Sequence, residues 1–195
     1  MREAKLEHNI ESDEVLMQAI TKGDKRAFDE LYRRYAKLLL AYFTRMLWKD
    51  REKAEDFVHD LFAKIIQKPE QFDPSRSFKT WAYSVANNMC KNEYKKQEVR
   101  KNTTSGIEHH EYVGDSSVNV FEEVQEAQFK EVFDLRMEEL DEKHSEAFRL
   151  RHIDGLSVKE IANVLGLNEG TVKSRVFYAI KYLAAGLKEF NPIEK

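Results

Sequence analysis

Residues 157–176 read SVKEIANVLGLNEGTVKSRV, and the capping and turn signals in this stretch decide the fold. Ser157 and Glu160 have the spacing of a capping box, in which each side chain accepts a hydrogen bond from the other residue's backbone N–H at the start of a helix. Gly166 can adopt the positive φ that ends such a helix, and Asn168 can cap the next one. The stretch therefore predicts a helix-turn-helix.

The second helix of this motif is predicted to bind DNA. Ala162 is small enough for close helix crossing, and the other expected core residues are Ile161, Leu165, Leu167, Val172 and Val176. In a helix-turn-helix the second helix enters the major groove, where residues near its N-terminus contact base edges. The residues expected to face DNA are Thr171, Lys173, Ser174, Arg175, Tyr178 and Lys181. Residues 157–188 hold 5 basic and 2 acidic side chains, whereas a helix predicted over about 130–146 holds 3 basic and 7 acidic ones. A helical hairpin used only for packing is the alternative.

The composition favours an all-α protein. The 195 residues include only 7 Gly and 3 Pro, and apolar residues recur at the three- and four-residue spacing that is typical of amphipathic helices. A single cysteine, Cys90, excludes an internal disulfide. No apolar run approaches the roughly 20 residues that span a bilayer, and the first residues lack the apolar core of a signal peptide. We therefore expect a cytoplasmic protein that does not insert into membranes.

The net charge of −3 is unevenly distributed along the chain. Residues 1–97 carry +3, residues 98–128 carry −5 and residues 129–195 carry −1. The middle segment also lacks a helical period and contains clusters of Ser, Thr and Gly, which is typical of a linker. We predict two small helical domains joined by a flexible acidic linker. The predicted boundaries are 1–11 for a disordered N-terminus, 12–97 for the first domain, 98–128 for the linker, 129–188 for the second domain and 189–195 for a tail.

An acidic face is predicted on the second helix of the first domain. A long amphipathic helix should begin near Asp24, and a further helix should follow over about 51–67. The apolar stripe of this further helix is Ala54, Phe57, Val58, Leu61, Phe62 and Ile65. The opposite face carries Glu52, Glu55, Asp56, His59 and Asp60. Two alternatives remain open for this face: docking onto basic residues of a protein partner, or a merely solvated surface.

Metal binding and catalysis are not expected. A di-iron bundle needs paired Glu-x-x-His motifs, and this chain holds a single Asp56-x-x-His59. No pairing of a nucleophile with a base is evident either. No catalytic residue, metal ligand or cofactor is therefore predicted.

A basic end is predicted for the third helix of the first domain. Pro69 should end the preceding helix, and Ser77 should cap a helix that runs from Phe78 to about Gln97. Asparagine amides can read base edges and lysines can hold phosphates. The residues expected to face nucleic acid are Trp81, Asn87, Asn88, Lys91, Asn92, Lys95 and Lys96. The alternatives are a solvated helix end that complements the helix dipole, and a core position for Trp81.

These motifs, in this order, resemble those of a bacterial RNA polymerase sigma factor of the extracytoplasmic-function (ECF) type. The stretch AEDFVHDLF at 54–62 is similar to the part of such factors that docks on the polymerase clamp. The stretch FDPSRSFKTWAYSVANN at 72–88 looks like the part that reads and opens the minus-ten element, and GTVKSR at 170–175 looks like the minus-thirty-five recognition helix. The resemblance extends over about 20–188.

The resemblance implies a sigma-2 domain over 12–97 and a sigma-4 domain over 129–188. The acidic face of 51–67 would bind core RNA polymerase through the largest catalytic subunit, and the position of Asn88 is that of a pocket for a flipped promoter base. The lysines beyond it would hold the displaced strand, and the linker would thread the polymerase channel that later holds nascent RNA. The resemblance also implies sequestration by an anti-sigma factor.

Three residues depart from the usual pattern of the family. His59 stands where glutamine is usual, Asp141 where proline is usual and Tyr178 where arginine is common. The last departure means that the promoter sequence cannot be transferred from relatives.

The sequence thus predicts a non-enzymatic transcription initiation factor that binds core RNA polymerase and promoter DNA and melts the minus-ten element. The alternative is a stand-alone helix-turn-helix regulator whose N-terminal module senses a ligand or dimerises. That alternative gives no role to the acidic face.

Overall fold

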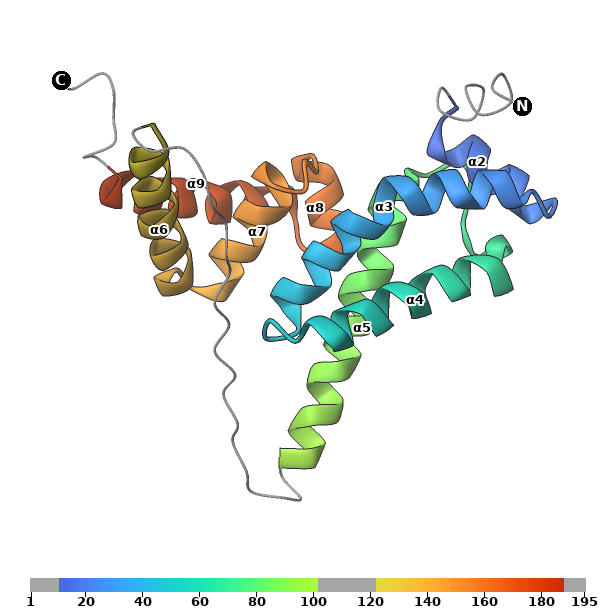
Figure 1. Ribbon diagram of the computed structural model, residues 1–195, viewed down its shortest axis with the longest axis horizontal. Coiled ribbons are helices and arrows are strands. Elements are labelled where there is room, and N and C mark those ends of the chain that lie inside the picture. The colour runs from blue at the N-terminus through green and yellow to red at the C-terminus, as the bar shows by residue number, and fades with distance from the viewer. Residues whose placement is uncertain (1–10, 102–121, 188–195) are drawn as a thin grey trace. The chain divides into compact units, whose positions relative to one another are not determined.

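The computed structural model describes residues 11–101 and 122–187, and these residues form helices without a strand (Figure 1). They belong to two compact units, one within residues 1–112 and one within 113–195. The all-α fold with two helical domains is therefore confirmed. Within the described ranges, no helix combines the length and the hydropathy needed to cross a membrane.

The first unit contains the helices α2 (Asp13–Thr21), α3 (Lys25–Met46), α4 (Arg51–Gln67) and α5 (Phe78–Lys101), with a short 3-10 turn at Pro69–Gln71. Asp24 caps α3, because its carboxylate accepts hydrogen bonds from the backbone N–H groups of Arg26 and Ala27 at 2.8 and 3.3 Å. Asp50 caps α4 in the same way. The predicted starts of both helices are confirmed, and α3 packs against α4.

Aromatic rings and leucines fill the core of the first unit. The largest fully buried side chains there are Tyr42, Tyr83, Phe43, Phe78, Leu16, Met17, Leu31, Leu39, Leu47, Leu61 and Ile65. Several of the rings meet edge to face, as Tyr42 and Tyr83 do with centroids 5.3 Å apart. This geometry suits the ring quadrupoles. Each helix thus buries one stripe and leaves the opposite face to solvent.

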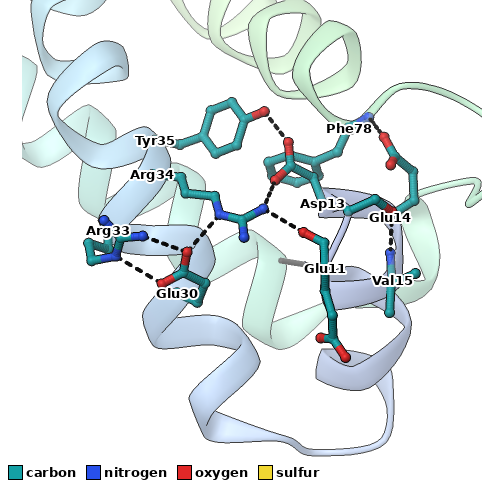
Figure 2. A network of polar contacts seen from close by, with 10 residues as sticks. Glu11, Asp13, Glu14, Val15, Glu30, Arg33, Arg34, Tyr35 and Phe78 are labelled. Carbon is teal, nitrogen blue, oxygen red and sulfur yellow. Dashed lines mark hydrogen bonds and ion pairs between the residues drawn. The ribbon is translucent and has the colours of Figure 1, made fainter. Parts of the chain in front are cut away.

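Helix α2 was not predicted as an element, and a polar network ties it to α3 (Figure 2). The Arg34 guanidinium donates to the Asp13 carboxylate at 2.7 Å, to Glu30 at 2.7 Å and to the backbone carbonyl of Glu11 at 2.9 Å. The Tyr35 hydroxyl donates to the other oxygen of Asp13. The first turn of α2 is therefore fixed on the middle of α3.

The second unit contains α6 (Glu122–Glu139), α7 (Glu142–His152), α8 (Val158–Leu165) and α9 (Glu169–Gly186). The prediction of one helix over about 130–146 is wrong, because the chain breaks between α6 and α7. Asp141 lies at this break, where its carboxylate accepts a hydrogen bond from the Lys143 N–H at 3.0 Å and starts α7. Asp141 is thus the N-terminal cap of α7.

Helices α8 and α9 form the predicted helix-turn-helix. Glu160 accepts from the Ser157 N–H at 2.8 Å while Ser157 accepts from the Glu160 N–H at 3.2 Å, so the capping box is confirmed. Gly166 has φ 70° and ψ 40°, the left-handed conformation that glycine adopts without strain. Asn168 caps α9 by accepting from the Thr171 N–H at 2.7 Å. Of the predicted core residues, Ile161, Ala162 and Val172 are buried, while Leu165, Leu167 and Val176 are half-buried.

Helix extends into both ends of the segment predicted as a linker. Helix α5 continues to Lys101, and α6 begins at Glu122. The rest of that segment, residues 102–121, lies outside the described residues, as do the predicted N-terminal segment up to residue 10 and the tail at 189–195.

Protonation of Glu30 should make the first unit less stable at acidic pH. It accepts two hydrogen bonds from Arg33 and one from Arg34, at 2.7–2.8 Å, and these bonds, with that from Arg33 the strongest, lower the pKa of its carboxyl from 4.5 to about 2. A carboxyl whose pKa is lower in the folded state than in the unfolded state stabilises the fold fully at pH values above its unfolded-state pKa. This stabilisation is lost as the pH falls through the folded-state pKa.

Glu30→Gln should therefore lower the free energy of unfolding at pH 7, with a difference from the wild type that shrinks progressively below pH 4.5. Urea unfolding between pH 7 and pH 3 measures this difference. The exposed control Glu70→Gln is expected to have a much smaller effect at every pH. A Glu30→Gln difference that does not change with pH would contradict the assignment.

Candidate functional site

The predicted acidic face lies on the exposed side of α4. All five of its members are exposed: Glu52, Glu55, Asp56, His59 and Asp60. The opposite side of the helix, with Ala54, Val58, Leu61 and Ile65, is buried in the core. Arg51 donates to Glu55 at 3.0 Å across one turn, and both side chains are largely exposed. The face is therefore available to a partner, and such an exposed ion pair contributes little stability of its own.

The basic end of α5 presents most of the predicted residues to solvent. Asn88, Lys91, Asn92, Lys95 and Lys96 lie toward the exposed side of α5 and away from the stripe of Ala82, Ala86 and Cys90, which is buried. Lys91, Lys95 and Lys96 are exposed, as is Asn88. This side combines amide groups with positive charge over about two turns of helix, which suits binding to bases and phosphates together.

Asn87 is placed differently from the other members of this set. Its side chain is 1% exposed. It follows Tyr83 by four residues and precedes Cys90 by three, and both of these are fully buried, so the three share the core face of α5. Asn87 therefore belongs to the packing of the first unit and does not face the surface that Asn88 presents.

Trp81 lies at the border between core and surface. Its ring packs against Phe72 and Phe78, with centroids 5.6 and 5.7 Å apart, and the residue is half-buried. The two sequence interpretations are therefore compatible, because part of Trp81 completes an aromatic cluster and part remains accessible.

A partly buried ion pair joins the acidic helix to the basic helix, and sequence reasoning missed it. Lys53 on α4 donates to the carboxylate of Glu93 on α5, which is 7% exposed and also accepts from Gln97 at 3.4 Å. Burial raises the pKa of Glu93, but the hydrogen bond and positive charge of Lys53, together with smaller contributions from Gln97 and Lys96, outweigh it, so the net shift is downward. The spacing along α5 could have predicted that Glu93 is buried. Glu93 follows Ala86 by seven residues and Cys90 by three, so it falls on the apolar stripe of the helix.

The predicted DNA-facing residues of α9 lie on or beside its exposed side. Lys173, Ser174, Tyr178 and Lys181 are exposed, while Thr171 and Arg175 are half-buried. The Tyr178 ring approaches the His144 ring of α7 with centroids 6.0 Å apart. Phe177, 61% exposed, lies beside Tyr178 and was not predicted as a surface residue. Its exposure could have been predicted from the sequence, because Phe177 is a large apolar residue that lies off the buried stripe of Val172, Ala179 and Leu183.

Within the ranges that the structure describes, no three His, Cys, Asp or Glu side chains gather in a way that could hold a metal ion. The candidate surfaces are three polar helix faces: the acidic face of α4, the basic end of α5 and the exposed side of α9. Charged and hydrogen-bonding groups on such a face can bind a macromolecule of complementary charge.

Comparison with known proteins matches both units to one family. Residues 31–100 match the model of sigma-70 region 2, and residues 130–183 match a model of sigma-70 region 4. The chain is 29% identical over 175 residues to the RNA polymerase sigma-H factor of Pseudomonas aeruginosa, covering 87% of this chain and 90% of the relative. It is also 29% identical over 175 residues to the ECF RNA polymerase sigma-E factor of Escherichia coli K12, covering 86% and 90%.

Two solved structures share the fold at 24% identity. One is CnrH in complex with the cytosolic domain of CnrY, with a TM-score of 0.61 over 93% of this chain and 100% of that chain. The other is the sigma factor RpoE in complex with the anti-sigma factor NepR from Bartonella quintana, with a TM-score of 0.60 over 80% and 96%.

The pair of Lys53 and Glu93 predicts a strongly non-additive stability effect. Lys53→Met should destabilise the first unit by about 1–3 kcal/mol, because it leaves the buried Glu93 carboxylate without its cation. The loss should be largest near neutral pH and smaller where Glu93 becomes protonated. Adding Glu93→Gln to Lys53→Met should recover part of the loss. Chemical denaturation of the two single variants and the double variant measures the coupling, and additive effects would contradict it.

Proposed function

The chain belongs to the ECF type of the sigma-70 family, and on this premise we propose which of its faces carry out the steps of transcription initiation. It is a sigma factor that directs RNA polymerase to promoters. Members of this family are initiation factors and not enzymes. We assign the steps of initiation to α4, α5 and α9, and we place the chain in the cytoplasm.

The acidic face of α4 docks on core RNA polymerase in this proposal. Its support is an exposed run of four carboxylates and one imidazole on a helix whose other side is buried: Glu52, Glu55, Asp56, His59 and Asp60. Such a face attracts lysines and arginines of a partner and speeds association. The rigid attachment of α4 to the core keeps the carboxylates in a fixed pattern.

The basic end of α5 captures the melted strand of the minus-ten element. Asn88 offers an amide that can donate to and accept from the edge of a flipped base, while Lys91 and Lys95 neutralise phosphates. Flipping a base costs a few kcal/mol of lost stacking and pairing, which contacts in a protein pocket offset. Because Trp81 is only half-buried, the accessible part of its ring can contact an unstacked base. Asn87 has no part in this surface.

Helix α9 reads the minus-thirty-five element in the major groove. Thr171, Lys173 and Ser174 lie near the N-terminus of the helix, where base edges are within reach. Arg175 can bind a guanine through two hydrogen bonds, and Lys181 lies farther along, where phosphates pass. Tyr178 replaces a commonly cationic position, so this face should favour a promoter element different from that of its relatives.

Two further parts of the proposal concern partners and the linker. The solved neighbour from Bartonella quintana was crystallised with an anti-sigma factor, and we infer that a protein of this class holds the present chain as well. The segment predicted as the linker, residues 98–128, carries a charge of −5, and its part between α5 and α6 would thread the polymerase channel that later holds nascent RNA.

The observation that carries the proposal is that three sets of polar side chains lie on three different helices while the apolar stripes of the same helices are buried. A stand-alone regulator needs only the face of α9. A factor that must hold polymerase and two promoter elements at once needs all three.

Reconstituted transcription tests the proposal directly. The chain added to core RNA polymerase should direct initiation at promoters identified by mapping transcription starts after its overexpression. Asn88→Ala combined with Arg175→Ala should lower specific initiation by at least about tenfold, because each side chain makes base contacts of about 1–3 kcal/mol. Gel shifts should show tight promoter binding only with core enzyme present. Tight duplex binding without it, or unchanged activity of the double variant, would favour the stand-alone regulator.

The α4 face predicts charge-dependent docking. Asp56→Asn with Asp60→Asn should weaken binding to core polymerase by about tenfold at low salt and by less at high salt, because salt screens exposed charges. The matched control, Asp29→Asn with Glu70→Gln, removes the same charge from exposed positions elsewhere. Competition binding with a labelled wild-type chain measures both. Equal weakening by the two pairs would show that net charge, and not this face, decides docking.

A further inference from the structure

The first turn of α5 is capped twice, once by its own sequence and once by another helix. Ser77 accepts a hydrogen bond from the Thr80 N–H at 3.3 Å. The carboxylate of Glu14 on α2 accepts from the Phe78 N–H at 3.0 Å, although the two residues are 64 positions apart (Figure 2). The first N–H groups of a helix have no partner within it, and an anion there is favoured by the helix dipole. Glu14 therefore binds the start of α5 from another helix, alongside the local cap that Ser77 supplies.

Phe78 is also held through its ring. It is fully buried and meets the rings of Tyr35, Phe72 and Trp81 with centroids 5.0–5.7 Å apart. The connector at 72–77 begins with Phe72 and leads into α5, whose first residue is Phe78. The residue to which Glu14 binds is therefore the centre of the aromatic cluster that contains Trp81.

Glu14 is itself held in place. Its neighbour Asp13 accepts from Arg34 at 2.7 Å and from the hydroxyl of Tyr35, and the same Tyr35 ring packs on Phe78. Burial raises the pKa of Glu14, but the hydrogen bond from Phe78 and further hydrogen bonds outweigh it, so the net shift is downward and the carboxylate is ionised at neutral pH. The first turn of α2 thus presents a charged acceptor at a fixed position.

We propose that Glu14 is a positioning residue for promoter opening: by binding the Phe78 N–H it sets the start of α5 and so aims Trp81 and Asn88 at the melted strand. This inference rests on the proposed role of α5. Glu14 need not touch DNA for this role. It acts through the position of a helix whose exposed residues must meet a flipped base to within a fraction of an ångström.

The competing explanation is that Glu14 only stabilises the first unit, and a matched variant separates the two. Asp24→Ala removes another carboxylate that caps a helix of the same unit, at the start of α3, without touching α5. Glu14→Ala and Asp24→Ala should lower the melting temperature by similar amounts. Glu14→Ala alone should slow minus-ten opening by about five- to tenfold, while Asp24→Ala should stay within about twofold of the wild type.

The experiment uses core RNA polymerase with the full chain and the promoter found by start mapping, with 2-aminopurine in the minus-ten element to report unstacking. Affinity for core enzyme should be unchanged in both variants. Glu14→Ala as fast as the wild type, or slowed no more than Asp24→Ala, would overturn the inference. Absence of promoter opening with the wild-type chain would instead refute the proposed function itself.

Glu14→Gln keeps the test decisive if Glu14→Ala does not fold. Glutamine has the same length and retains an oxygen that can accept from the Phe78 N–H. It should open the promoter at a rate within about twofold of the wild type and keep the Phe78 amide protected from hydrogen exchange. Slow opening with the Phe78 amide still protected would show that the hydrogen bond does not position α5, and the inference would fail.

Discussion

The first unit depends on the burial of Phe78. Its ring is fully buried between Tyr35 of α3, Phe72 of the connector and Trp81 of α5, and its backbone N–H is bound by Glu14 of α2. Phe78 thus links the start of α5 to α2 and α3, which lie far from it in the sequence, and to the connector that precedes it. Because Phe78 is also the first residue of α5, its burial anchors the N-terminal end of that helix in the core.

The exposed faces follow from the small size of each unit. A small domain buries a modest share of its surface, so each helix can bury only one stripe and must leave its other side in water. In α4 the exposed side is acidic, and in the second half of α5 it is basic. The ion pair of Lys53 with Glu93 crosses between these two helices, so the acidic face of α4 and the basic end of α5 are held by the same core.

Local signals predicted most of the helix ends, because a cap needs only neighbouring residues. Asp24, the Ser157–Glu160 box and Gly166 all lie where expected. Features that depend on distant contacts were missed. Helix α2 carries local signals, a Ser12 cap and a buried stripe of Leu16, Met17 and Ile20, but its attachment to Arg34 and Tyr35 of another helix is not visible in the sequence. The charged composition of 130–146 hid the break at Asp141.

The site residues show the same division between local and distant information. Composition marked the end of α5 as basic and rich in asparagine, but it could not separate Asn87 from Asn88. Adjacent residues on a helix point about 100° apart, so one is buried with Tyr83 and Cys90 while the other is exposed. The pairing of Glu93 with Lys53 depends on α4 lying beside α5, which only the packed structure gives.

Photo-crosslinking from single positions tests the central claim, which is that three separate faces meet three separate partners. A crosslinking amino acid would replace His59, Lys95 or Ser174, all of which are exposed, in a complex with core polymerase and promoter DNA. We expect crosslinks to the largest polymerase subunit from position 59, to the melted strand from 95 and to the upstream duplex from 174. Crosslinks from position 59 to DNA, or from 95 to protein alone, would contradict the claim.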